Sequence, residues 1–187
     1  MNENRRLKLS TLRWRNEAEH LSGRSERRGM SGIEVRIAVP EDVGAIASVI
    51  LEAFEPFKAE YTPGAFEYTT PGSDIISERF AEGPIWLALD GNEPVGTVSG
   101  LPEPDRFYIR SMAVKPSAQG RGIGQKLMDA LESHTRDAGF ERLYLYTTFV
   151  LPGAQPLYEK NEFYIVRETL PEEWFGMGGF EMEKRIS

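Results

Sequence analysis

The sequence predicts a mixed α+β (mixed α/β) fold in one main domain. Strand patterns are first clustered along the chain and then alternate with helical patterns, which is the order expected of this fold class. The chain has 187 residues, of which 40% are hydrophobic, so it can bury one core of ordinary size. We therefore expect a single domain over residues 32–187.

Local patterns place the elements of the first half. Residues 33–38 alternate apolar and polar side chains, as a strand with one buried face does. A helix then begins at Pro40, because proline and acidic residues favour a first turn. Residues 55–72, rich in proline, glycine and aromatic side chains, are expected to form a loop before a shorter helix capped at Ser73. The apolar residues that follow Pro40 at helical spacing are Val43, Ile46, Ala47, Ile50, Leu51 and Phe54.

The second half continues with a hairpin and further strand–helix units. Residues 85–89 and 94–101 flank a turn, which predicts the hairpin. A helix over residues 120–138 is expected to end at Gly139, because glycine favours the position just past a helix. The remaining predicted elements are strands at 107–114, 143–147, 163–167 and 179–185 and a short helix at 153–160.

Charge is distributed unevenly along the chain. Residues 1–31 carry eight Lys or Arg and four Glu, whereas the remainder carries 14 basic and 25 acidic residues. An arginine-rich arm could contact nucleic acid or a membrane, but we expect a disordered basic leader. It lacks the apolar core of a signal peptide, its glutamates disfavour a transit peptide, and Met30 offers an alternative start of the chain.

Composition excludes several classes of site. The chain has no cysteine and only two histidines, so we expect no disulfide, no thiol nucleophile and no metal site. The longest apolar stretch, residues 43–51, is far shorter than the roughly 20 residues of a membrane span. We expect a cytoplasmic protein without a membrane partner.

A glycine-rich turn before the long helix is the most informative motif. The segment Gln119-Gly120-Arg121-Gly122-Ile123-Gly124 opens that helix. Glycines allow close approach of a ligand, and the free N–H groups and dipole of a helix N-terminus favour an anion such as a pyrophosphate. The alternative is a tight turn that binds nothing. The spacing matches neither a dinucleotide-binding GxGxxG unit nor a P-loop.

Gln119, Gly122 and Gly124 resemble the Q/R-x-x-G-x-G/A motif of the GNAT acetyltransferase superfamily. A second block, A-x-x-L-Y-E-K-x-x-F, resembles a downstream motif of that superfamily and lies one helix and one strand later. It is formed by Ala154, Leu157, Tyr158, Glu159, Lys160 and Phe163. The resemblance covers roughly residues 33–186. It implies a splayed, mostly antiparallel central sheet of about six to seven strands, about four flanking helices, acetyl-CoA as cosubstrate and no metal, and it leaves a homodimer open.

The resemblance also implies roles for particular residues. Backbone N–H groups of the turn would bind the pyrophosphate, and a strand edge would pair with the pantetheine arm. Tyr158 would be the general acid that protonates the leaving thiolate. The alternative is an aromatic core residue, and both hold if the ring is buried and the hydroxyl is presented to the site. Arg121 either adds charge at a phosphate or is solvated. The expected cofactor-binding residues are Met112, Ala113, Val114, Gln119, Gly120, Arg121, Gly122, Ile123, Gly124 and Gln125.

The chain departs from the family pattern at several positions. Leu151 stands where the family often has Asn, and Glu162 stands where it has Gly. Tyr108 and Tyr146 occupy positions where some relatives carry a glutamate base. The sequence therefore identifies no general base. The remaining candidates are Asp105, Glu55 and Glu60, acting through water or merely lying on the surface, and His134, which we expect to be structural.

Together these observations favour an N-acetyltransferase that moves an acetyl group directly from acetyl-CoA to a primary amine of a small molecule or protein. No Ser, Cys or Lys nucleophile with a recognisable partner indicates a covalent intermediate. A non-catalytic acyl-CoA-binding or regulatory module is the alternative. A nucleic-acid binder has no aromatic platform or groove-reading motif in its favour. The acidic body would attract cationic amines, but it does not identify the acceptor.

Overall fold

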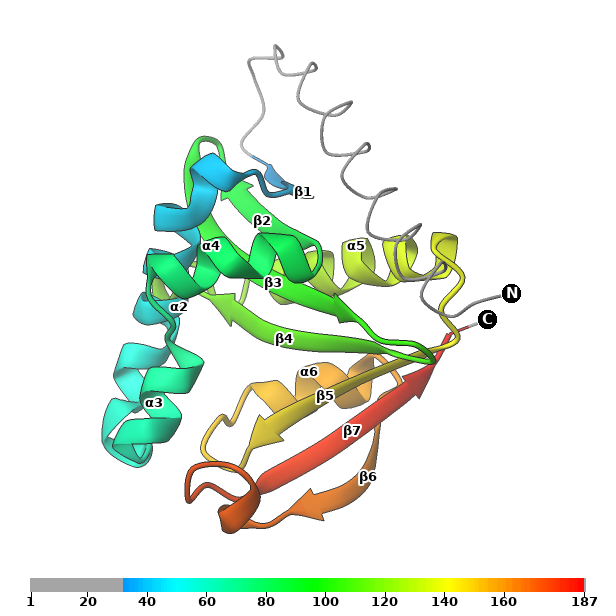
Figure 1. The fold of residues 1–187 in the computed structure, drawn as a ribbon. Coiled ribbons are helices and arrows are strands. Elements are labelled where there is room, and N and C mark those ends of the chain that lie inside the picture. The colour runs from blue at the N-terminus through cyan, green and yellow to red at the C-terminus, as the bar shows by residue number, and fades with distance from the viewer. Residues whose placement is uncertain (1–31, 187) are drawn as a thin grey trace.

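A seven-stranded sheet runs through residues 32–186, the part of the chain that the computed structural model describes (Figure 1). The strand order is β1-β2-β3-β4-β5-β7-β6, and every neighbouring pair is antiparallel except β4 and β5. The mixed, mostly antiparallel fold is thus confirmed, whereas the predicted leader at 1–31 lies outside the described residues. The strands are β1 (Ile33–Ile37), β2 (Ile85–Asp90), β3 (Glu93–Pro102), β4 (Phe107–Val114), β5 (Arg142–Thr148), β6 (Tyr164–Thr169) and β7 (Gly179–Arg185).

Five α-helices accompany the sheet within the described residues: α2 (Val43–Phe54), α3 (Pro63–Thr69), α4 (Ser73–Glu82), α5 (Ile123–Asp137) and α6 (Ala154–Lys160). Helices α2 and α4 cover one face of the sheet and α5 covers the other (Figure 1). Strand β2 is consequently apolar on both sides, since Ile85 and Leu87 pack towards α2 while Trp86 and Ala88 pack towards α5. Among residues 32–186, the structure contains no helix with the length and hydrophobicity of a membrane span.

The expected loop at residues 55–72 is instead largely helical. A 3₁₀ helix (Glu55–Glu60) follows α2 directly, and α3 then begins at Pro63. The Thr62 side chain accepts a hydrogen bond from the Ala65 N–H at 3.2 Å, which caps α3. Threonine followed by proline is a helix-start signal, but the proline, glycine and aromatic content of the segment obscured it.

Two details of the predicted helices were also wrong. Leu51 is 47% exposed and Val49 is buried, so the apolar face of α2 is rotated relative to the expected one. In α4, Ser73 is the first helical residue and its side chain makes no cap hydrogen bond; the N-cap position belongs to Gly72. The predicted end of α5 is correct, because Gly139 takes a left-handed φ of 80° just beyond it.

The sheet splits between β4 and β5. These strands pair only at Phe107–Leu143, Tyr108–Tyr144 and Ile109–Leu145, and beyond these pairs they diverge (Figure 1). A bulge in the β3–β4 register adds to the distortion of β4, where Ser111 has a φ of 54°. The split leaves room in the middle of the sheet for a site whose walls are strands.

Candidate functional site

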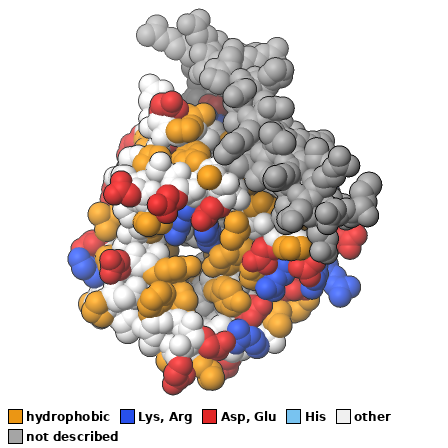
Figure 2. Space-filling model, viewed as in Figure 1, with side chains coloured by type: hydrophobic (Ala, Val, Ile, Leu, Met, Phe, Trp, Pro, Cys, Tyr) orange, Lys and Arg blue, Asp and Glu red, His pale blue; other side chains and the backbone are white. Residues whose placement is uncertain are grey.

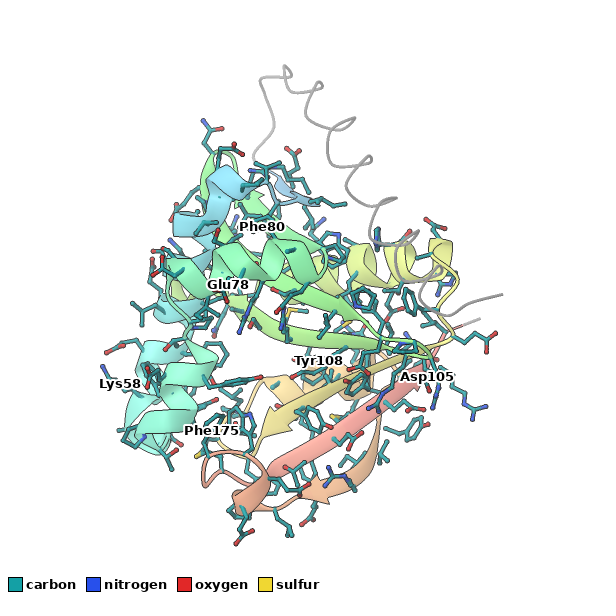
Figure 3. All side chains as sticks on the ribbon, viewed as in Figure 1. Lys58, Glu78, Phe80, Asp105, Tyr108 and Phe175 are labelled. Atoms are coloured by element: carbon teal, nitrogen blue, oxygen red, sulfur yellow. The ribbon has the colours of Figure 1, made fainter. Side chains whose placement is uncertain are left out.

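A cavity of about 300 Å³ opens where β4 and β5 diverge. Its walls include residues of α2, α3, α4, α6, β4, β5, β6 and the segment between β6 and β7, so distant parts of the chain meet in one place. Figure 2 shows hydrophobic side chains, with Lys or Arg among them, in the middle of the same face. Tyr108 lies beside the gap between the two strands (Figure 3). The aromatic residues of the wall include Tyr61, Tyr68, Tyr108, Tyr146, Tyr158 and Trp174.

Tyr158 reaches this cavity from α6. The residue is 7% exposed, and its ring packs on Phe163 with 5.9 Å between centroids. Its hydroxyl makes no hydrogen bond to any residue in 32–186. Burial, followed by the nearby Tyr108 and Tyr61, raises the pKa of Tyr158, so the phenol stays protonated at neutral pH. The side chain is therefore both a core residue and a potential proton donor.

The glycine turn before α5 is open towards solvent. Gly120 and Gly122 take left-handed φ values of 76° and 75°, and a Cβ at either position would meet nothing within 4 Å. Gly122 is the N-cap of α5, and the Lys126 N–H donates to its carbonyl at 3.1 Å. The preceding N–H groups of the helix have no acceptor within it, so this backbone can hold an anion.

Three residues of the motif have structural contacts within the protein. Arg121 Nη1 pairs with Asp90 Oδ2 at 2.7 Å, and Gln119 Nε2 donates to the Val114 carbonyl at 3.2 Å. A Cβ on Gly124 would lie 3.2 Å from the Leu157 side chain, so the glycine lets α5 pack closely against α6. Arg121, Gln119 and Gly124 thus have structural contacts, and the backbone N–H groups of the turn are the part of the motif that could bind an anion.

Strand β4 offers a free edge beside the cavity. Beyond Ile109 it has no pairing with β5, while Ala113 and Val114 remain paired with β3. Met112 lines the cavity itself. An extended ligand could pair with this edge as an added strand would. Such pairing was expected for the backbone of Met112, Ala113 and Val114.

None of the sequence-predicted base candidates lines the cavity. Glu55 pairs with Lys58 at 3.3 Å, Asp105 pairs with Arg142, and Glu60 is exposed. Figure 3 shows Asp105 at the edge of the sheet and Lys58 beside α3. No three His, Cys, Asp or Glu side chains of the described chain gather as metal ligands.

Glu173 is the one carboxylate in the cavity wall among residues 32–186, and no sequence pattern indicated it. Arg167 Nη1 donates to both of its oxygens at 2.9 and 3.0 Å, and the Leu170 N–H donates at 2.7 Å. The Arg167 hydrogen bonds and then the Leu170 hydrogen bond lower the pKa of Glu173. A carboxylate held in this way is a weak base.

The family model of the acetyltransferase (GNAT) family matches residues 46–163, which include the turn, both diverging strands and Tyr158. The chain belongs to the GNAT acetyltransferase family. Its GNAT relatives include the Mus musculus protein named "Probable N-acetyltransferase family 8 member 5", 31% identical over 60% of this chain and 52% of that protein. N-acetyltransferase 8F1 of Rattus norvegicus is 31% identical over 42% of this chain and 38% of its own length. The chain thus spans about half or less of the length of these two relatives.

Solved structures share the GNAT fold. The PaiA N-acetyltransferase of Thermoplasma acidophilum, determined in complex with coenzyme A, superposes with a TM-score of 0.72 at 18% identity over 83% of this chain and 99% of that one. An aminoglycoside 6′-N-acetyltransferase, also complexed with coenzyme A, gives a TM-score of 0.65 at 16% identity over 82% of this chain and 97% of that one. At 18% and 16% identity, the structural similarity establishes a shared fold and nothing more specific.

Three of the four departures from the GNAT pattern lie in the cavity wall, whereas Glu162 does not. Leu151, Tyr108 and Tyr146 line the cavity, so apolar and phenolic groups stand where some relatives place amide or carboxylate groups. His134 lies away from the cavity and contacts the Trp86 ring edge-on at 5.4 Å. The histidine is placed for packing, as its position in α5 indicated.

None of the three arginines of the described cavity wall, Arg79, Arg110 and Arg167, was recognised from the sequence. Arg79 on α4 is 6% exposed and donates from Nη1 to Ser111 Oγ at 2.8 Å, and Arg110 on β4 pairs with Glu82. A charged residue is ordinarily expected on the surface. The available signal was the spacing of Arg79 from Ile76, because residues three apart share a helix face and Ile76 is fully buried.

Proposed function

We propose that this protein transfers an acetyl group from acetyl-CoA directly to a primary amine. The observation that carries the proposal is the combination of an open helix N-terminus, a free strand edge and a cavity containing Tyr158, all around the split between β4 and β5. The names of the GNAT relatives and the coenzyme A complexes of the structural neighbours support it.

The chain offers a separate contact for each part of acetyl-CoA. The N–H groups from Gly120 to Gln125 would hold the pyrophosphate, and the glycines leave the space that its oxygens need. The edge of β4 from Met112 to Val114 would align the pantetheine arm and bring the thioester to the cavity. Acetyl-CoA supplies an activated acyl group, and the protein contributes position and polar contacts.

Tyr158 would donate its phenolic proton to the sulfur as the carbon–sulfur bond breaks. The raised pKa keeps this proton in place at neutral pH, and a forming thiolate within hydrogen-bond reach would receive it. The attacking amine forms the new carbon–nitrogen bond and gives its own proton to solvent. We assign this proton to no side chain because Glu173 is already bound by Arg167.

The placement of the cofactor can be tested by calorimetry with acetyl-CoA. Gly122→Glu would put a carboxylate beside the phosphates, and we expect affinity to fall at least about tenfold. Gly139→Glu is a matched control at the other end of α5. Gly139 has a similar φ of 80°, and a Cβ there would also meet no atom within 4 Å. Equal affinity in the parent and in Gly122→Glu would remove the turn from the cofactor site.

A non-catalytic acyl-CoA-binding module is the second candidate. One observation favours it: the single carboxylate in the described cavity wall is engaged in an ion pair and is not free to accept a proton. Such a module would bind acetyl-CoA through the same turn and strand edge but would acetylate no amine. Binding measured together with transfer therefore separates the two candidates.

A further inference from the structure

Arg79 is a buried cation without a counter-ion. It is 6% exposed, and its one hydrogen bond within the described residues goes to Ser111 Oγ at 2.8 Å. It takes part in no ion pair there. Burial and then the positive charge of Arg110 lower the pKa of Arg79, and the smaller opposing effects of Tyr68, Glu82 and Tyr108 do not outweigh them.

Neighbouring acidic groups are already paired. Arg110 is bound by Glu82, and Arg167, the third arginine of the wall, is bound by Glu173 and Glu181. Arg79 is therefore the one cation of the described cavity wall that lacks a carboxylate. Burying an unpaired charge is costly, so a fold that keeps one at a cavity favours an anionic ligand there.

The geometry of a guanidinium limits what that anion can be. Arginine stays charged and presents five N–H donors in a planar fork, of which Ser111 uses one. A carboxylate accepts two parallel hydrogen bonds from such a fork. The rest of the wall is rich in aromatic rings, including Tyr68, Tyr108 and Trp174, and these suit an apolar body on the same ligand.

We infer that the acceptor is an amino acid with an apolar or aromatic side chain, and that Arg79 binds its carboxylate. This inference rests on the proposed acetyl transfer. Arg79 contacts Ser111, which precedes Met112 on the strand edge where the thioester would lie. The amine of an amino acid is two bonds from the carboxyl carbon, so a carboxylate at Arg79 holds the amine beside that edge. The amide nitrogen–carbon bond then forms, the thioester bond breaks, Tyr158 protonates the sulfur and the amine proton leaves to solvent.

Arg79 could instead have a structural role. Its hydrogen bond to Ser111 fixes a residue of the β4 bulge that has a left-handed φ of 54°. A purely structural role would affect every acceptor equally. The test therefore uses pairs of acceptors that differ only in the carboxylate: phenylalanine with phenethylamine, tryptophan with tryptamine, and leucine with isoamylamine. Acetyl transfer to each is measured with the parent, Arg79→Gln, Arg79→Lys and the control Arg142→Gln.

The parent should prefer each amino acid over its decarboxylated partner by about 10- to 100-fold in kcat/KM, the value of a charge-assisted hydrogen-bond pair. Arg79→Gln should lose that preference while its kcat/KM for the simple amines and its acetyl-CoA affinity stay within about twofold. Arg79→Lys should fall between, because it keeps the charge and loses the fork. Arg142 lies outside the cavity wall and is paired with Asp105, so its variant should behave as the parent.

A parent that acetylates the simple amines as well as the amino acids would overturn the inference and leave the proposed function standing. Equal losses on both members of each pair in Arg79→Gln would show a structural role and overturn it as well. Absence of transfer to any acceptor would count against the proposed function instead. In that case the inference is decided by calorimetry of the same amino acids with the coenzyme A-bound parent and with coenzyme A-bound Arg79→Gln. No binding to the parent, or equal affinity for the parent and the variant, would overturn the inference. Where Arg79→Gln fails to fold, the Arg79→Lys variant carries the comparison.

Discussion

Tyr158 is a core residue of α6, and we propose that it is also the general acid. Its ring packs on Phe163 between helix and sheet. Its hydroxyl has no hydrogen-bond partner among residues 32–186, and the residue lines the cavity. The hydroxyl could therefore donate a hydrogen bond to a ligand atom there.

Replacing Tyr158 with Phe keeps the ring and removes the hydroxyl. We expect folding and acetyl-CoA affinity to hold, while the rate of transfer in a single turnover falls about 10²- to 10⁴-fold, the usual contribution of a general acid. Single-turnover measurement avoids masking by product release. Tyr164→Phe is the control, because Tyr164 is exposed and its hydroxyl donates to Glu183 outside the cavity. Equal rates in the parent and Tyr158→Phe would exclude Tyr158 from the chemistry.

Residues in short motifs could be identified from the sequence, and residues joined only by folding could not. The turn from Gln119 to Gly124 is a contiguous pattern whose position at a helix start followed from local rules. The block around Tyr158 is also contiguous, and the family resemblance implied its place at the site. Arg79 and Glu173 come from segments almost a hundred residues apart. Nothing local indicates that either would face the same cavity.

At the scale of elements, the approach to α2 is fixed by one carboxylate. Asp42 accepts a hydrogen bond from the Val39 N–H at 2.8 Å and two from Arg36 at 2.7 and 2.9 Å. Burial alone would raise the pKa of Asp42, but the hydrogen bonds from Arg36 and Val39 outweigh it and lower that pKa. The stability from this carboxylate is therefore present at neutral pH and lost as the pH falls through the carboxyl range.

Asp42→Ala should lower the free energy of unfolding by about 1–2 kcal/mol at neutral pH, because it removes a backbone cap and a bidentate ion pair. Urea denaturation measures the loss, which should shrink as the pH falls below about 4, where the parent's carboxyl also protonates. Glu41→Ala changes an exposed neighbour and should shift stability by less than about 0.5 kcal/mol. Equal stability of Asp42→Ala and the parent at neutral pH would contradict this account of the helix start.

Elements with strong periodicity were predicted well. Strands β4 and β7 have the expected bounds, because alternation and flanking turns mark their ends. The helix α3 was missed, since seven residues give too little periodicity to outweigh a proline and a glycine within them. The exposed position of Leu51 depends on how α2 lies against the sheet, which is a tertiary property.

At the scale of the whole molecule, the parallel β4–β5 junction is what creates the site. Three residue pairs hold the two parts of the sheet together, and divergence beyond them frees one edge of β4 and opens the cavity. The turn before α5 follows β4 in the chain, so the expected cofactor site and the cavity share one strand. Local patterns cannot show such a split, because the pairing joins strands separated by α5; only the family resemblance implied it.

The most direct test of the account is acetyl transfer itself. The full chain is incubated with acetyl-CoA and the panel of amines and amino acids, and free coenzyme A and N-acetylated product are quantified by mass spectrometry. We predict equal amounts of the two products with at least one acceptor, and no acetylated protein as an intermediate. Acetyl-CoA that binds with measurable affinity but is consumed with no acceptor beyond its rate in buffer would contradict the account and favour the non-catalytic module.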